Sequence, residues 1–266
     1  MELVHATLKE SIATMSRVIF ALMLRETKTR YGRLQIGYLW AFLEPILLIS
    51  ALGLVFTYIR MRDSSTMPLI QFLTTGFIPF MLFRDIVTQN MTAIRSNHQL
   101  LYFPQVQVFD IGVARTLLEL STFLIVFTVL TIAISFTGIE VVSVEDPLRM
   151  ILASTLIVIF GYGIGAAIGS MIPLFPSLQF IVQAAFMRPM FFLSGVFFTL
   201  EMIPNEAQPY AALNPMLQLI ELFRSAYFPD YESTHIDYPY LLSVIFLTLF
   251  FGLLIQRALR RHAFKT

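Results

Sequence analysis

Residues 36–59, IGYLWAFLEPILLISALGLVFTYI, form an apolar run of 24 residues in which Glu44 is the only charged side chain. A helix needs about 20 apolar residues to cross a hydrocarbon layer roughly 30 Å thick. The run therefore predicts a membrane-spanning helix. It also places a carboxylate within the membrane, where an ionisable group costs about 2.5–3.5 kcal/mol on insertion scales.

The rest of the chain repeats this pattern. Hydrophobic residues make up 57% of the 266 residues and charged residues 13%, about half the charged share of an ordinary soluble domain. We predict an all-α polytopic membrane protein with six transmembrane helices in a single transmembrane domain, residues 1–266. This composition excludes a soluble enzyme, a disordered chain and a nucleic-acid-binding protein. The other five predicted spans are residues 68–93, 108–137, 148–170, 178–200 and 240–256.

Charge predicts the orientation. If both termini lie on one side, that side holds 11 Lys and Arg residues, whereas the opposite segments hold three basic and ten acidic residues. Basic residues collect on the cytoplasmic side of a membrane, so both termini are expected in the cytoplasm. The acidic start of the chain lacks the charged-then-apolar pattern of a cleaved signal peptide, and we expect none.

Two flanking segments carry further patterns. Residues 1–35 show apolar residues at steps of three or four between charged ones, which predicts an amphipathic interface helix. Packing of this helix on a protein partner remains the alternative. Residues 201–237 contain four prolines, which exclude one long helix, and the pair Asn214-Pro215 is a good helix start. We predict short re-entrant helices here. The residues expected to form the basic entry of the interface helix are Arg25, Lys28, Arg30 and Arg33.

The chain offers little catalytic chemistry. Its four histidines are scattered without metal-ligand spacing, and it contains no Cys for a disulfide or a Cys-ligated metal. Gly161, Gly165 and Gly169 lie four residues apart in a predicted span without the Lys-Ser/Thr end of a phosphate loop. They predict close helix packing. We expect no cofactor, no metal site and no ATPase activity in this chain.

Three charges are predicted at nearly one depth in the membrane. At 1.5 Å per residue, Glu44 lies about 12 Å, Arg84 about 14 Å and Arg188 about 15 Å from the cytoplasmic ends of their helices. We call these residues the midplane charges. Either Glu44 closes an ion pair with one arginine and fixes the packing, or an arginine faces a water-filled path and meets an anionic or hydroxyl-rich substrate. Aromatic residues expected to form sugar-stacking walls of this path are Tyr38, Trp40, Phe42, Tyr58, Phe80 and Phe83.

Two nearby charges receive separate predictions. Asp85 follows Arg84 but points about 100° around the helix, so we expect it to serve another neighbour. Arg115 and Glu119 are one helical turn apart, which favours an internal ion pair between them.

Several motifs together resemble a known family. The stretch RETKTRYGRLQIGYLWAFLEP, residues 25–45, resembles the approach to the first membrane helix in KpsM-type permease subunits of capsular polysaccharide ABC exporters. Nearly the whole chain takes part in this resemblance. The supporting motifs are TGFIPF at 75–80, YFP at 102–104, NP at 214–215 and ELFR at 221–224.

The resemblance implies a transporter subunit of the bacterial inner membrane. In this family the permease forms a dimer with two separate ATPase subunits, which bind ATP and Mg. The resemblance implies that residues 94–106 are the coupling segment docked in the ATPase, and that residues 201–237 are periplasmic gate helices. It also implies a lipid-anchored, acidic polysaccharide as substrate, with a periplasmic adaptor and an outer-membrane channel as further partners.

The residues agree with a coupling role for residues 94–106. This predicted cytoplasmic loop exposes apolar groups, which is costly unless a partner covers them. Loop 171–177 is uncharged and tight, and is a poorer ATPase contact. The residues expected to contact the ATPase are Arg95, Asn97, Leu100, Leu101, Tyr102, Phe103 and Pro104.

Three alternative functions stay open. The chain could export O-antigen or another lipid-linked glycan, because sequence does not reveal where substrate is recognised. A membrane-embedded enzyme acting on lipid-linked sugar should show a catalytic acid or His cluster near one membrane face, and the external acids are spread without one. A passive channel or scaffold is the third possibility.

Overall fold

The computed structural model describes residues 8–31, 37–58, 67–103, 105–136, 144–233 and 236–259. Five helices in it are long and apolar enough to cross a membrane. Their bounds differ from the predicted spans by about three residues or fewer, because the length of an apolar run is a local property. These helices are α2 (Gly37–Tyr58), α3 (Leu69–Met91), α5 (Val108–Phe136), α6 (Pro147–Met171) and α11 (Tyr238–Leu259).

The span predicted at 178–200 is shorter than expected. It comprises α7 (Leu178–Ile181), a π-helical segment (Val182–Met187) and α8 (Arg188–Leu193), a length of about 24 Å at 1.5 Å per residue. The chain turns at Gly195, whose φ of 74° is in the left-handed region that favours glycine. The apolar residues between Gly195 and Leu200 extended the apolar run in the sequence, but the helix already ends at Leu193.

Helix α3 lies at the centre of the bundle, and most of its residues are buried. Helix α6 packs against α3 on one side and α11 on the other. A methyl group at Gly165 would lie 2.7 Å from Cβ of Asn90, and one at Gly169 would lie 2.4 Å from the Asn90 carbonyl oxygen. The predicted packing role of the α6 glycines is therefore confirmed.

Residues 201–237 contain short helices, as predicted: α9 (Gln208–Ala211) and α10 (Pro215–Tyr227). Asn214 caps α10, because its side chain accepts a hydrogen bond from the Met216 N–H at 3.0 Å. Every residue from Met216 to Tyr227 is buried. Helix α10 packs against α3 and α6, so protein rather than solvent or lipid surrounds it.

Two charged side chains hold α10 to its neighbours. Arg224 is fully buried and donates to the carbonyl oxygens of Gly195 at 2.6 Å and Val196 at 3.0 Å. Glu221 accepts from the Leu200 N–H at 3.3 Å and from the Tyr231 hydroxyl. Burial, reinforced by the Glu221 charge, raises the pKa of Tyr231, which keeps this donor protonated. The turn after α8 is thus fixed by α10.

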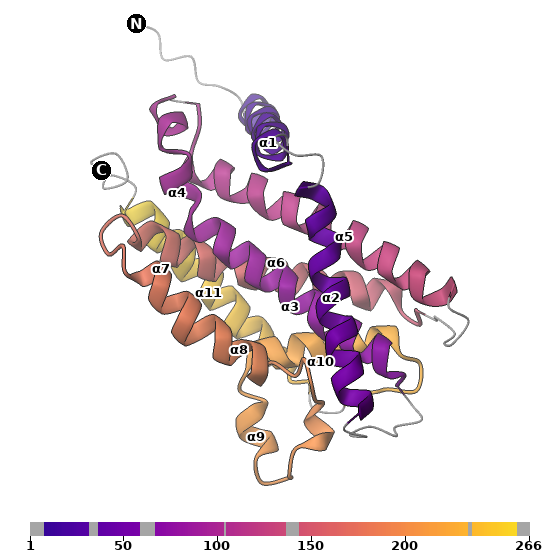
Figure 1. The fold of residues 1–266 in the computed structure, drawn as a ribbon. Coiled ribbons are helices and arrows are strands. Elements are labelled where there is room, and N and C mark those ends of the chain that lie inside the picture. The colour runs from indigo at the N-terminus through magenta and orange to yellow at the C-terminus, as the bar shows by residue number, and fades with distance from the viewer. Residues whose placement is uncertain are drawn as a thin grey trace, which may run out of the picture.

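Helix α1 (Leu8–Tyr31) crosses one end of the bundle, close to α4 (Ala93–Ser96), whereas α9 lies at the opposite end (Figure 1). Ile19 and Leu22 of α1 are buried against the coupling segment and α5. Phe20 and Leu24 on the same helix are exposed. One face therefore packs on the rest of this chain and another is exposed, and the membrane interface and the protein partner both stay predictions for the exposed face.

Candidate functional site

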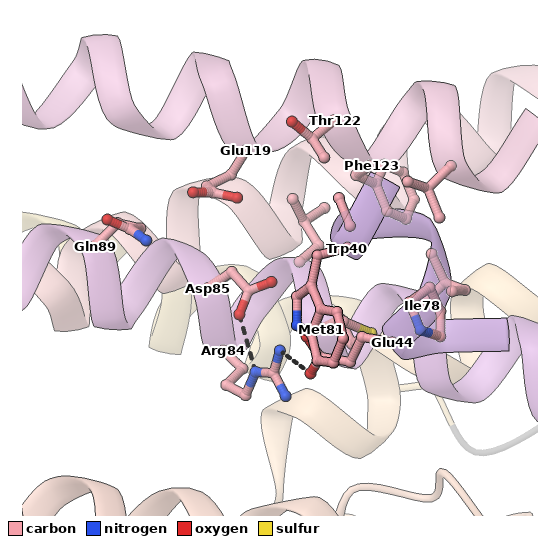
Figure 2. A pocket seen from close by; sticks show the side chains of 14 residues that line it. Trp40, Glu44, Ile78, Met81, Arg84, Asp85, Gln89, Glu119, Thr122 and Phe123 are labelled. Carbon is pink, nitrogen blue, oxygen red and sulfur yellow. Dashed lines mark hydrogen bonds and ion pairs between the residues drawn. The ribbon is translucent and has the colours of Figure 1, made fainter. Parts of the chain in front are cut away.

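Two of the three midplane charges, Glu44 and Arg84, line a cavity of about 320 Å³ between α2, α3 and α5 (Figure 2). Arg84 donates from Nη2 to Glu44 Oε1 at 3.0 Å and from Nε to Asp85 Oδ1 at 2.9 Å. The closed Glu44–Arg84 pair is therefore present. Asp85, which was expected to serve another neighbour, pairs with Arg84, because the long arginine side chain bends back to the adjacent carboxylate. Polar residues that also line this cavity are Gln89, Glu119 and Thr122.

Arg188 lies apart from this group. Its side chain is exposed, and within the described ranges no ion pair joins it to a carboxylate. The alternative Glu44–Arg188 pair is not formed. Arg188 nevertheless shares a second cavity, of about 570 Å³, with Arg84 and Asp85. We call this cavity the aromatic groove, because its apolar walls include Phe77, Phe80, Phe191 and Phe192.

The π-helical segment positions Arg188 at the groove. This segment ends at Met187, directly before Arg188, and Pro189 follows. Proline has no N–H to donate to a preceding carbonyl, and single π-helical turns occur frequently at functional sites. Gln183, Met187 and Arg188 all line the groove. The irregular turn thus presents a polar and a charged side chain to the same cavity.

The aromatic residues predicted to form the walls of the path lie in different environments. Trp40 is 60% exposed and lines the Glu44 cavity. Tyr58 is exposed near the end of α2 but lines neither cavity. Phe83 is fully buried, stacks on Phe160 with ring centroids 5.3 Å apart, and lines neither cavity. The Tyr38 side chain lies outside the described residues.

The residues of the coupling segment also divide by burial. Tyr102 is 68% exposed and Phe103 61% exposed, and Arg95 is exposed as well. Leu101 is buried with Ile19 and Leu22 of α1, and Leu100 is half-buried. Both leucines belong to the 3-10 helix His98–Tyr102. Only part of the predicted set therefore offers a surface to a partner.

Asn97 faces the inside of the molecule. It is buried, and its Oδ1 accepts a hydrogen bond from Arg25 Nη1 at 2.7 Å. Arg25 thus connects α1 to the coupling segment, although Arg25 and Lys28 are both exposed. Three of the predicted positions, namely Arg33, Pro104 and the Arg30 side chain, lie outside the described residues.

Sequence reasoning missed a second polar centre, which surrounds Arg115. Arg115 forms an ion pair with Glu26 of α1 and donates to the Gln89 carbonyl oxygen at 2.7 Å. It also donates to Thr92 Oγ1 at 3.1 Å and Ser96 Oγ at 2.7 Å. The predicted pairing of Arg115 with Glu119 is wrong. We call Arg115 and these four partners the Arg115 network.

The sequence contained one signal for this network. Glu26 follows Arg25 within the quoted family motif, and these adjacent residues supply both polar links from α1. Glu26 lies far from Arg115 in the chain, so local spacing favoured the wrong partner. Among the described residues, no group of three His, Asp or Glu side chains is arranged to hold a metal ion.

The fold and its charges define a polytopic α-helical membrane protein with charged side chains among its helices and a polar connection between α1 and the segment that follows α3. The chain belongs to the ABC-2 type transporter family, whose family model matches residues 17–228. It is 33% identical over 246 residues to the polysialic acid transport protein KpsM of Escherichia coli, covering 92% of this chain and 94% of that protein. It is 35% identical over 260 residues to the capsule polysaccharide export inner-membrane protein CtrC of Neisseria meningitidis serogroup A, covering 95% and 94%. The O-antigen export system permease protein RfbA of Klebsiella pneumoniae is more distant, at 23% over 242 residues, 85% of this chain and 88% of that protein.

Proposed function

We propose that this chain is the membrane-spanning subunit of an ATP-driven exporter that moves a lipid-anchored, acidic capsular polysaccharide across the bacterial inner membrane. The observation that carries the proposal is similarity over more than nine-tenths of the chain to proteins named for capsule polysaccharide export. In this proposal two copies of the chain assemble with two ATPase subunits, which bind ATP and Mg. Both termini face the cytoplasm, and a periplasmic adaptor and an outer-membrane channel continue the route.

The aromatic groove is the proposed path for the sugar chain. Arg84 already binds two carboxylates, whereas Arg188 is exposed at the groove. An arginine fork matches carboxylate and phosphate groups, so Arg188 is the proposed contact for the acidic groups of the polymer. The groove aromatics provide flat apolar faces suited to sugar rings.

Tyr102 and Phe103 are the proposed ATPase contact. Both are large, apolar and exposed at the end of the molecule that carries α1. Such groups are costly to leave in water and are typical of the centre of a protein interface. ATP-driven closure of the partner would push this segment and tilt α3 and α5, which flank it.

Co-purification and reconstitution test the proposal. The chain is expected to purify with a nucleotide-binding subunit and, in proteoliposomes, to make ATP hydrolysis depend on the acidic polymer. The double substitution Tyr102→Ala and Phe103→Ala should abolish co-purification and leave insertion intact. Arg17→Ala, at an exposed position of α1 outside the coupling segment, is the control and should leave co-purification intact. A chain that purifies alone and transports nothing when the ATPase is supplied contradicts the proposal.

O-antigen export is the second candidate, and the likeness to the Klebsiella pneumoniae permease favours it as an alternative. The two functions differ in the polymer that is carried. Transport of a neutral O-antigen chain at the same rate as an acidic capsule chain would favour this alternative, because the proposed Arg188 contact has no partner on a neutral sugar.

A further inference from the structure

The Arg115 network lies where the chain leaves α3 for the coupling segment. Helix α3 ends at Met91, and α4 begins at Ala93. The last carbonyl groups of a helix lack intrahelical donors, and a cation is favourable there. Arg115 of α5 supplies that cation and donates to the Gln89 carbonyl oxygen. The break between the two helices is therefore stabilised from a third helix.

The same guanidinium group reaches the coupling segment and α1. It donates to Ser96 Oγ at 2.7 Å and pairs with Glu26. The side chains of Arg115 and Glu26 are only 6% and 13% exposed, so water competes little for this ion pair. Arg115 thus joins α1, the end of α3, the coupling segment and α5 through one side chain.

A second link is parallel to the first. Arg25 donates to Asn97 Oδ1 at 2.7 Å, and Asn97 donates back to the Ala93 carbonyl oxygen at 3.2 Å. Around both links, Ile19 of α1 packs with Ile94 and the rest of an apolar cluster. Polar and apolar contacts therefore hold α1 to the same short segment.

We propose that Arg115 is a positioning residue that locks the interface helix α1 and the coupling segment into one rigid body through Glu26. This inference rests on the proposed ATP-driven export. A push on the coupling segment then displaces α1 and α5 together. Without the Glu26–Arg115 link, ATP hydrolysis continues, but less of the motion reaches the membrane helices.

The test uses the full transporter, the permease with its ATPase partner, in proteoliposomes. Glu26→Gln removes one charge and keeps the shape of the side chain. We expect normal co-purification and ATPase activity, with polymer exported per ATP hydrolysed reduced about fivefold. Lys28→Gln removes an exposed charge two residues away and should leave this ratio unchanged. An unchanged ratio for Glu26→Gln overturns the inference.

A distance measurement separates positioning from a general loss of structure. The chain contains no Cys, so spin labels can be attached through Thr29→Cys on α1 and Gln99→Cys on the coupling segment, both exposed positions. We expect a narrow distance distribution that ATP does not shift, and a broader one in the Glu26→Gln background. A distance that shifts with ATP in the otherwise native chain contradicts the rigid body. If the complex hydrolyses ATP without exporting polymer, the proposed function fails, and the width of the distribution still decides whether Glu26 joins α1 to the coupling segment.

Discussion

Arg84 and Arg115 both lie in apolar helices and both bind carboxylates, yet their surroundings differ. The Arg84 side chain is 32% exposed, borders two cavities and binds partners on α2 and on its own helix. The Arg115 side chain is 6% exposed and contacts α1, the end of α3 and the coupling segment. Both arginines therefore join helices, and they differ in that Arg84 also borders two cavities whereas Arg115 is buried where α1, α3 and the coupling segment meet.

The largest effect is expected for Arg115→Met. Removal of one member of a buried ion pair leaves the other charge without compensation, which costs about 3–5 kcal/mol. The free energy of unfolding in detergent should fall by about this amount. Arg17→Met, on the exposed face of α1, is the control. If the free energy of unfolding falls by less than about 1 kcal/mol, Arg115 does not contribute to stability as a buried ion pair should, and its contrast with Arg84 is lost.

The second effect concerns transport and not stability. Arg188→Ala removes a charged hydrogen-bond donor, worth about 1.5–3 kcal/mol, so uptake of an acidic polymer into inverted vesicles should fall by about one to two orders of magnitude. The amount of folded protein should not change, because no ion pair within the described ranges depends on Arg188. Arg188→Lys should retain most of the activity. If Arg188→Ala reduced the transport of acidic and neutral polymers equally, the proposed contact between Arg188 and the acidic groups of the polymer would be contradicted.

A smaller, compensable effect is expected at Arg84. Arg84→Met leaves Glu44 and Asp85 facing the cavities, and their negative charge should repel an acidic polymer. Adding Glu44→Gln should restore part of the transport, with a coupling free energy of about 0.5–1 kcal/mol in a double-mutant cycle. Strict additivity of the two substitutions would mean that the Glu44–Arg84 pair contributes nothing to the path.

The smallest effect is expected at Tyr58. This residue is 87% exposed and lines neither cavity, and exposed substitutions usually change free energies by less than about 0.5 kcal/mol. Tyr58→Ala should leave transport within about twofold of the native rate. Trp40→Ala, at the lining of the Glu44 cavity, should lower it more. The opposite order would move the sugar path toward the end of α2 that carries Tyr58.

The sequence predicted features that depend on local length and composition. Helices α2, α3, α5, α6 and α11 were predicted from apolar runs, and the α10 start was predicted from Asn214-Pro215. Partners were predicted less well, because helical periodicity defines a face but not the neighbour that covers it. Helical spacing favoured Glu119 as the partner of Arg115, whereas the structure pairs Arg115 with Glu26 of α1. Phe83 illustrates the same limit, since an aromatic side chain suits a sugar wall and a packed core equally well.

Thiol labelling tests most directly whether the aromatic groove is a hydrated path. The chain has no Cys, so Thr88→Cys and Gln183→Cys, both at the groove lining, can each be probed with a charged, water-soluble methanethiosulfonate in membrane vesicles. Phe246→Cys, on the exposed apolar face of α11, is the lipid-facing control. We predict rapid labelling at Thr88→Cys and Gln183→Cys, slowed by the acidic polymer, and none at Phe246→Cys. Absence of labelling at both groove positions, under conditions that label Lys28→Cys on the exposed face of α1, would contradict a water-filled path beside Arg188.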